Sequence, residues 1–451
     1  MKLKRIILCC CFEIFSFTVL VSGRNTTTES CLQELSRRDD ADGRNDDTNT
    51  LHVDYFPVGK GNRFARKRFP RGIGSTPNFH AASILSLMEV ETALKRMQKA
   101  YPDRMKLATT GIKTHEGRSV YFTVLGSSSR PPRVFLVGGT RGRDRGGPDY
   151  LVYLISDLLW ADRHNSSLRY GGREYGVDKV RRVLDHGLAL IPLANPDGVH
   201  YDLMTGSCWR KNRRPRSSVS DIGVEIDANF EAVWHDERLA QENATRLAMA
   251  RTMSRDRKRL HLVEPEHLPE PEMQSIYNVL RDVTSVSWYL DVHSVQGQVV
   301  YTSARGEVDH RQKRLSLSGR YRDRFGGRGT GDNSAERSAA HRMVRAMNSV
   351  GDEAFYRAYE AAAAAAAAAA TTTTATASSS SSSSAHCLGP NRINALRLIF
   401  GKHVDTRRCQ DYFYPDAYKY HQNMLQTTVG LMEFLLNAAE GGGEGDNMFR
   451  C

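Results

Sequence analysis

The sequence of 451 residues lacks the patterns that mark a nucleic-acid-binding protein or a zinc ribbon. It has no Cys-x-x-Cys pair, no zinc finger and no RNA-binding signature, although Lys and Arg number 63 against 51 Asp and Glu. The basic residues gather at 63–71 and 311–328, and we interpret both runs as solvated surface. Specific nucleic-acid binding is therefore not expected. A basic scaffold that binds acidic glycans or nucleic acid through 311–328 is a weaker alternative.

Long apolar runs are scarce as well. The apolar stretch 6–21 follows a basic start and leads into small residues, which predicts a signal peptide over residues 1–23. No later segment is long and apolar enough to span a bilayer, so stable membrane insertion is not expected. Asn-x-Ser/Thr acceptors at Asn25, Asn165 and Asn243 are compatible with the secretory route. The sequence therefore predicts a secreted protein.

Cysteine is infrequent after this segment. Three of the eight cysteines lie in the predicted signal peptide, so 8 − 3 = 5 remain in the mature chain. They are Cys31, Cys208, Cys387, Cys409 and Cys451. An odd number leaves at least one thiol free or paired between chains, and the spacing does not determine which cysteines pair.

Composition divides the rest of the chain. Residues 24–79 are polar with little apolar periodicity, which predicts a flexible leader. The basic run at 66–68 is either a processing site, which would make the leader a propeptide, or part of a solvated linker. A compact domain is expected over residues 80–440. Within it, the Ala, Thr and Ser block 361–384 is read as a low-complexity insertion or a gene-model artefact, and 441–451 as a flexible tail.

Apolar periodicity in the domain predicts an α/β fold. Leu87, Val90, Leu94, Met97 and Tyr101 recur every three or four residues, as on one face of an amphipathic helix. Further helices are expected over 150–159, 273–280 and 424–436, and strands over 120–125, 134–137, 188–193, 287–292, 299–301 and 396–400. Strands separated by helices predict a mixed, mostly parallel central sheet with helices on both faces, and such sheets place their chemistry at the carboxyl ends of strands.

Four short motifs are more specific than composition. Asn195-Pro196-Asp197-Gly198 follows an apolar strand, and Trp209-Arg210-Lys211-Asn212 comes shortly after it. Glu225-Ile226-Asp227-Ala228-Asn229 is next, and Glu270-Pro271-Glu272 then opens a helix that leads to Asp291-Val292-His293-Ser294. Together, in this order, the motifs resemble those of the zinc metallocarboxypeptidase family, over roughly residues 80–440. The resemblance includes Glu116-Gly117-Arg118 in an early turn.

The resemblance implies a zinc ion with three protein ligands, a glutamate general base, and arginines that bind peptide or protein C-termini. Two ligands are expected in a His-x-x-Glu motif after the strand 134–137, and this chain has Arg141 and Asp144 there. A guanidinium has no lone pair to donate to a metal, so Arg141 cannot be a ligand. The third ligand position holds His293. Zinc is thus the expected cofactor, with His293 and Asp144 as its candidate ligands.

The remaining site positions depart from the family in part. Arg210 matches the arginine that polarises the substrate carbonyl, and Arg143 matches an outer substrate-binding arginine; a surface role is the alternative for both. The resemblance also implies a group of side chains that grips the terminal carboxylate of the substrate. This chain has Asp227, Ala228 and Asn229 at those positions, and Asn229 is kept as a substrate-binding candidate.

The general base is missing from its expected place. No Glu occurs between Glu360 and Glu433, and Lys402 or His403 stands near the position of the base, depending on a one-residue gap. Substitutions at Arg141, Asp227, Ala228 and Lys402 make a catalytically impaired, peptide-binding pseudoenzyme that uses the old cleft around Arg210 our preferred hypothesis. The alternative is an active secreted zinc carboxypeptidase in which Asp144, His293 and an unplaced group hold the metal.

Overall fold

The structure is a computed structural model of the chain. It describes residues 52–54, 58–65, 70–76, 79–81, 83–127, 129–215, 222–226, 270–302, 334–361, 393–404 and 408–441. The predicted signal peptide 1–23 lies outside these residues, as do the basic runs 66–68 and 311–328, residues 362–384 of the Ala, Thr and Ser block, and residues 442–451 of the predicted tail.

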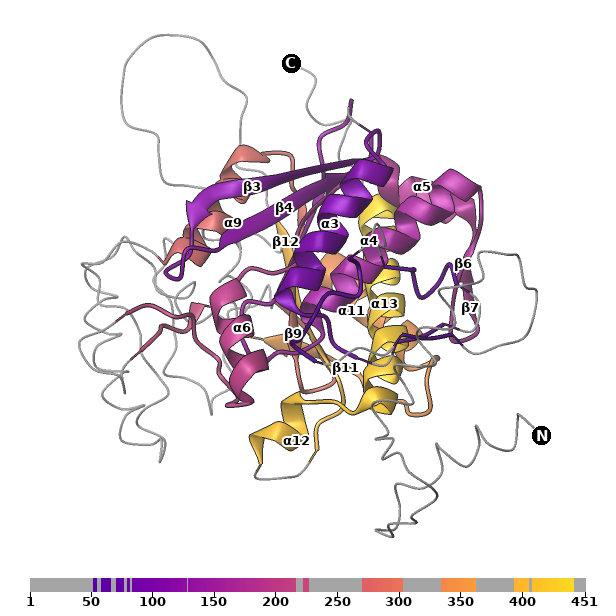
Figure 1. Cartoon of the computed structure of the whole chain (residues 1–451). Coiled ribbons are helices and arrows are strands. Elements are labelled where there is room, and N and C mark those ends of the chain that lie inside the picture. Colours follow the sequence, from indigo (N-terminus) through magenta and orange to yellow (C-terminus); the bar gives the residue numbers. More distant parts are fainter. Residues whose placement is uncertain are drawn as a thin grey trace, which may run out of the picture.

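The centre of the fold is an eight-stranded sheet (Figure 1). In spatial order its strands are β11 (Arg357–Ala361), β10 (Gln298–Thr302), β12 (Asn394–Phe400), β9 (Trp288–Ser294), β5 (Val134–Gly138), β8 (Leu188–Ile191), β4 (Ser119–Leu125) and β3 (Met105–Lys113). Strands β12, β9, β5 and β8 are parallel neighbours, as are β10 and β11; β12 with β10, β8 with β4, and β4 with β3 are antiparallel. The sheet is therefore mixed and mostly parallel, as the sequence predicts.

Both faces of the sheet are covered. Along β5, Val134 and Leu136 enter a large apolar cluster on one face, while Phe135 and Val137 enter a smaller cluster on the other. The large cluster includes side chains of α3 (Leu87–Ala100), α4 (Gly147–His164), α5 (Val177–His186), α11 (Ser334–Met347) and α13 (Ala417–Glu440). The smaller cluster contains the apolar face of α9 (Pro271–Asp282). Strands buried on both faces explain the continuous apolar runs of β5 and β8.

The predicted helices and strands are confirmed, with small differences at most ends; α13, expected over 424–436, is longer and runs over Ala417–Glu440. Helix α3 begins at a capping box, in which Ser86 accepts a hydrogen bond from the Glu89 backbone and the Glu89 carboxylate accepts one from the Ser86 backbone. The sequence does not predict α5, α6 (Pro196–Thr205), α11, the short α12 (Cys409–Phe413), or the strands β1 (His52–Asp54), β2 (Phe79–Ala81), β3, β6 (Leu168–Tyr170), β7 (Arg173–Tyr175) and β11. No helix among the described residues is long and apolar enough to cross a membrane.

Part of the segment expected as a flexible leader packs against the domain. Phe64 and Ile73 are buried in the large cluster, and the Arg63 guanidinium forms a buried ion pair with Glu89 at 2.8 Å. Strand β1 (His52–Asp54) pairs in parallel with β2 (Phe79–Ala81) in a sheet separate from the central one. A second two-stranded sheet joins β6 (Leu168–Tyr170) to β7 (Arg173–Tyr175). The packed structure thus extends to residues well before 80. The sequence does not indicate this, because an irregular segment can fill a core without showing any apolar period.

Candidate active site

The candidate site lies in the loops at the carboxyl ends of β5, β8 and β9. Asn195, the N-cap of α6, ties two of these loops together. Its Nδ2 atom donates to the carbonyl oxygens of Thr140 (3.0 Å) and Lys211 (3.1 Å), and its Oδ1 accepts from the Gly198 amide (2.8 Å). The Asn-Pro-Asp-Gly motif therefore acts as a brace between the loop of residues 141–144 and the loop that carries Arg210.

Gly142 lets these loops approach each other closely. A Cβ atom at this position would lie 2.5 Å from the Gly198 carbonyl oxygen and 2.6 Å from that of Trp209, so no larger residue fits without movement of backbone. The Gly142 amide donates to the Arg210 carbonyl at 3.2 Å. The neighbours of Gly142, Arg141 and Arg143, are in this way held beside Arg210.

His293 is buried between two carboxylates. Its Nδ1 lies 2.9 Å from Oδ2 of Asp144, and its Nε2 lies 2.5 Å from Oδ2 of Asp291. Asp291 and His293 point to the same face because they are two residues apart on β9. The Ser294 amide also donates to Asp144 Oδ2, at 3.2 Å. The structure thus brings together Asp144 and His293, the two candidate metal ligands, and adds Asp291, which the sequence analysis missed.

Three arginines lie close to one another beside this group. The Arg141 guanidinium lies 4.0 Å from Asp144 Oδ2, and Arg210 forms an ion pair with Glu225 at 3.1 Å. Burial lowers the pKa of the Arg143 guanidinium; Asp144 opposes this shift, while Arg210 and Arg141 add to it. Arg141 and Arg210 thus place like charges close to Arg143, which is unfavourable unless an anion is near. We refer to Arg141, Arg143 and Arg210 as the arginine cluster.

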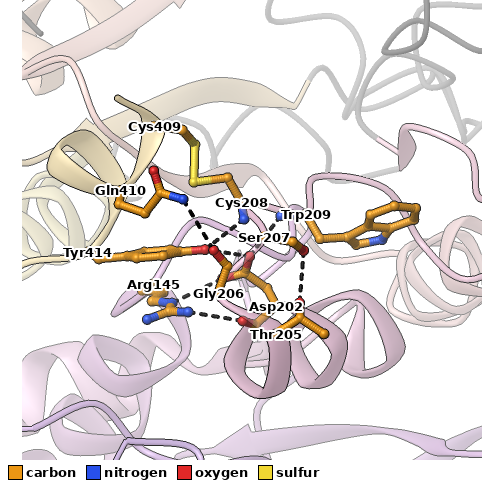
Figure 2. The surroundings of a disulfide bond; sticks show 10 residues. All are labelled: Arg145, Asp202, Thr205, Gly206, Ser207, Cys208, Trp209, Cys409, Gln410 and Tyr414. Atoms are coloured by element: carbon orange, nitrogen blue, oxygen red, sulfur yellow. Dashed lines mark hydrogen bonds and ion pairs between the residues drawn. A yellow bond between two sulfur atoms is a disulfide. The ribbon is translucent and has the colours of Figure 1, made fainter. Parts of the chain in front are cut away.

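A disulfide holds one wall of the site. Cys208, next to Trp209 and Arg210, is bonded to Cys409 at the start of α12 (Cys409–Phe413), 201 residues away (Figure 2). The Phe413 ring lies 4.3 Å from the Arg143 guanidinium carbon, in a cation–π contact. The disulfide therefore links α12 to the Arg210 loop at the point where Phe413 covers the arginine cluster.

Tyr414 continues this wall. Its hydroxyl accepts a hydrogen bond from the Cys208 amide (2.7 Å) and donates to Asp202 (2.8 Å), as Figure 2 shows. The Tyr414 ring stacks on Arg145, 3.4 Å from the guanidinium carbon, and Arg145 in turn pairs with Asp202 at 3.0 Å. Of the five cysteines expected in the mature chain, Cys31, Cys387 and Cys451 lie outside the described residues.

The other candidate positions lie away from this group or outside the described residues. Lys402 is exposed and forms an ion pair with Glu353 on the surface, and the ring of His403 packs edge-on against Tyr412. These contacts do not bring Lys402 or His403 to His293. Asp227, Ala228 and Asn229 lie outside the described residues.

A second cluster of polar side chains joins the turn after β3 to the start of α9. His115 Nε2 lies 2.8 Å from Glu270 Oε2, and Asn212 donates to both Glu270 Oε2 (2.7 Å) and Glu272 Oε2 (3.0 Å). Arg214 donates to Glu270 Oε1 at 2.7 Å. The hydrogen bond to Glu270 raises the pKa of His115, although burial opposes it, and burial raises the pKa of Glu272 to about 7.

The motif Glu116-Gly117-Arg118 also has a structural partner. Asp197 of the Asn-Pro-Asp-Gly motif is fully buried and accepts hydrogen bonds from the Arg118 guanidinium (2.8 Å), the Glu116 amide (2.8 Å) and the Thr114 hydroxyl (2.9 Å). Two motifs about 80 residues apart are therefore locked together. These contacts fix the turn between β3 and β4 against the start of α6.

Comparison with known proteins agrees with this architecture. The family model of the zinc carboxypeptidases matches residues 90–426. Human carboxypeptidase A6 is 23% identical over 219 residues, 48% of this chain and 44% of the relative. A zinc carboxypeptidase of Saccharothrix mutabilis subsp. capreolus is 25% identical over 172 residues, 37% of this chain and 35% of the relative. The chain thus spans less than half the length of these curated relatives.

Solved structures show the same fold. The crystal structure of carboxypeptidase A from Helicoverpa armigera has a TM-score of 0.52 and 16% sequence identity, covering 80% of this chain and 75% of that one. The structure of bovine thrombin-activatable fibrinolysis inhibitor also has a TM-score of 0.52, with 14% identity, over 79% of this chain and 98% of that one. Since the family model matches well over half of the sequence, this chain belongs to the zinc carboxypeptidase family.

Proposed function

We propose that this protein is a catalytically impaired member of its family that binds peptide or protein C-termini at the arginine cluster. The family is zinc-dependent and acts on C-termini. The observation that carries the proposal is the position of Arg141, whose guanidinium lies 4.0 Å from the Asp144 carboxylate. A permanent positive charge there repels a metal cation and cannot replace a ligand.

The environment of His293 supports the same proposal. Both of its ring nitrogens are within hydrogen-bond distance of carboxylate oxygens. The ring is thus already paired on both sides within the chain, and the Arg141 guanidinium stands where a further ligand would be needed. The residues at this position therefore do not fit a zinc ion with three protein ligands. We derive no catalytic step through one.

The arginine cluster has the chemistry to hold an anionic chain end. Arg143 is stacked on Phe413, and the charges of Arg141 and Arg210 act on it. A carboxylate bound among these guanidinium groups would offset their mutual repulsion and accept charge-assisted hydrogen bonds. Hydrolysis needs a metal or a general base in addition, and Lys402 is exposed and paired with Glu353.

A peptide-binding experiment tests this proposal. We expect fluorescent peptides with a free C-terminal carboxylate to bind at least about tenfold more tightly than the same peptides with a C-terminal amide, since a charge-assisted pair contributes about 1.5–3 kcal/mol. Arg143→Ala and Arg210→Ala are expected to abolish this preference, while the exposed Arg169→Ala keeps it. Equal binding of the two peptides by the wild-type protein would contradict the proposal.

One observation favours the alternative of an active zinc carboxypeptidase with a rearranged metal site. The Oδ1 atom of Asp144 is buried and has no hydrogen-bond partner, and a cation would satisfy it. In that case, protein dialysed against metal-free buffer would hold one zinc per chain that is lost in His293→Ala, and it would hydrolyse C-terminal peptide substrates. If the wild-type protein lacks that zinc, the result supports the catalytically impaired, peptide-binding function.

We also propose that the protein enters the secretory route. The apolar stretch 6–21 and its basic start support this. N-terminal sequencing of protein from the medium of expressing cells tests it, and a first residue near 24 is expected. Protein retained in the cells with an intact N-terminus would contradict it.

A further inference from the structure

The cluster at the start of α9 has the arrangement of a cation site. One ligand atom each of His115, Glu270 and Glu272 lies within 4.8 Å of the others. We propose that these three side chains bind a divalent cation of the zinc type, at a site separate from His293 and Asp144. The inference does not depend on the proposed function, because it concerns different residues.

The hydrogen bonds of the two carboxylates leave one oxygen unsatisfied. Glu270 Oε1 accepts from Arg214, and Glu270 Oε2 lies against His115 and Asn212. Glu272 Oε2 accepts from Asn212. Glu272 Oε1 is buried without a hydrogen-bond partner, in a residue that is 0% exposed. A buried carboxylate oxygen with no donor is costly, and a metal ion in the cluster would satisfy it.

The dipole of α9 does not account for this arrangement. Negative side chains are favourable in the first turn of a helix, and Glu270 and Glu272 have that advantage. His115 comes from another element, the turn between β3 and β4, and it directs its Nε2 at Glu270. Two elements thus converge on one point with one imidazole and two carboxylate groups.

The donor set selects the cation. One imidazole nitrogen and two carboxylate oxygens are ligands that zinc accepts in a four-coordinate site with one water. Arg214 is bound to the other oxygen of Glu270, which leaves Oε2 directed toward His115. The Arg214 charge weakens the attraction for a cation, so we expect weaker binding than in a site of cysteine thiolates.

A cation here would brace the Arg210 loop. Asn212, two residues after Arg210, donates to both glutamates, and its Oδ1 accepts from the Val224 amide at 2.8 Å. Its backbone amide donates to the Val224 carbonyl at 2.9 Å. The metal would therefore join the β3–β4 turn, α9 and the loop that carries Arg210. Its role is structural.

Titration of the metal-free full chain with zinc tests the proposal, by calorimetry and by the shift of the unfolding temperature. The wild-type protein is expected to bind zinc at a site that His115→Ala and Glu272→Gln weaken at least about tenfold. Glu272→Gln keeps the size of the side chain and guards against a folding defect. His293→Ala and His164→Ala, which removes an exposed histidine of α4, are expected to keep this zinc and its stabilisation.

The outcomes are distinct. If zinc binding is unchanged in folded His115→Ala and Glu272→Gln, or if the wild-type protein binds no zinc, the inference is wrong. Zinc lost only in His293→Ala contradicts both the inference and the impaired function. Absence of zinc from every variant overturns the inference and leaves the proposed function intact.

Discussion

His293 Nδ1 lies 2.9 Å from the Oδ2 atom of Asp144, although the two residues are 149 positions apart. The two meet because β5 and β9 are adjacent parallel strands, so that the loops after them start at the same edge of the sheet. Asp291 completes the group from the other side of the ring. The site is therefore a buried cluster of one imidazole and two carboxylate groups, with the arginine cluster beside it.

The first prediction concerns the stability of that buried cluster. His293→Ala would leave Asp144 and Asp291 buried without the ring between them, and each buried polar group that loses its hydrogen-bond partner costs about 1–3 kcal/mol. We expect the free energy of unfolding to fall by about 3 kcal/mol or more in urea titrations. The exposed His164→Ala should be unchanged within error. A neutral effect of His293→Ala would show that the two carboxylates do not depend on the ring.

The second prediction concerns the position of Arg141. Arg141→His would replace the guanidinium beside Asp144 by an imidazole and give three side chains able to hold zinc. We expect zinc affinity at this position to rise at least about tenfold, measured in a His115→Ala background to remove the second site. Arg141→Gln, which removes the charge without adding a ligand, is the control. Equal zinc binding by the two variants would show that Arg141 is not what keeps the metal away.

The sequence could predict the elements that are buried on both faces. The sequence pattern predicts strands β5 and β9 and helix α9 because their apolar residues are continuous or periodic. Strand β3 was missed because it lies at the sheet edge and most of its side chains are wholly or partly exposed. The packing of Phe64 and Ile73 was missed since an irregular segment has no period to detect.

The site could be predicted only in part. The positions of Asp144, His293 and Arg210 follow from the resemblance, but the surface pairing of Lys402 with Glu353 depends on the path of the loop. Asp291 had a readable signal, because it shares the strand face of His293. The Cys208–Cys409 disulfide had none, because pairing across 201 residues follows from the fold and not from local spacing.

The third prediction concerns this disulfide. Replacing both cysteines, Cys208→Ser with Cys409→Ser, should free α12 from the Arg210 loop and cost about 2–4 kcal/mol of stability. Because Phe413 stacks on Arg143, we also expect weaker binding of peptides with a free C-terminus. Chemical unfolding and the peptide-binding assay measure the two effects, and mild reduction of the wild-type protein should reproduce them. Unchanged peptide binding by the reduced wild-type protein would show that the position of α12 does not affect binding at the arginine cluster.

The fourth prediction concerns the pH dependence of stability. Burial raises the pKa of Asp149 from 3.8 to about 7, although the carboxylate accepts hydrogen bonds from the Tyr420 hydroxyl and the Leu85 amide. Between these pH values the folded state holds a proton that the unfolded state has released, so the contribution of Asp149 to stability falls as the pH rises from about 4 to about 7. A shift of this size corresponds to up to about 4 kcal/mol.

A matched pair of variants isolates this effect. Burial lowers the pKa of His421 to about 4, which makes stability rise with pH over the same range, so the wild-type profile alone mixes opposite contributions. We therefore expect the stability difference between the wild-type protein and Asp149→Asn to shrink between pH 4 and pH 8, in urea titrations at each pH. Asp103→Asn, which removes an exposed carboxylate from the turn before β3, should show no such trend. A difference that stays constant with pH would mean that Asp149 does not take up a proton on folding in this range.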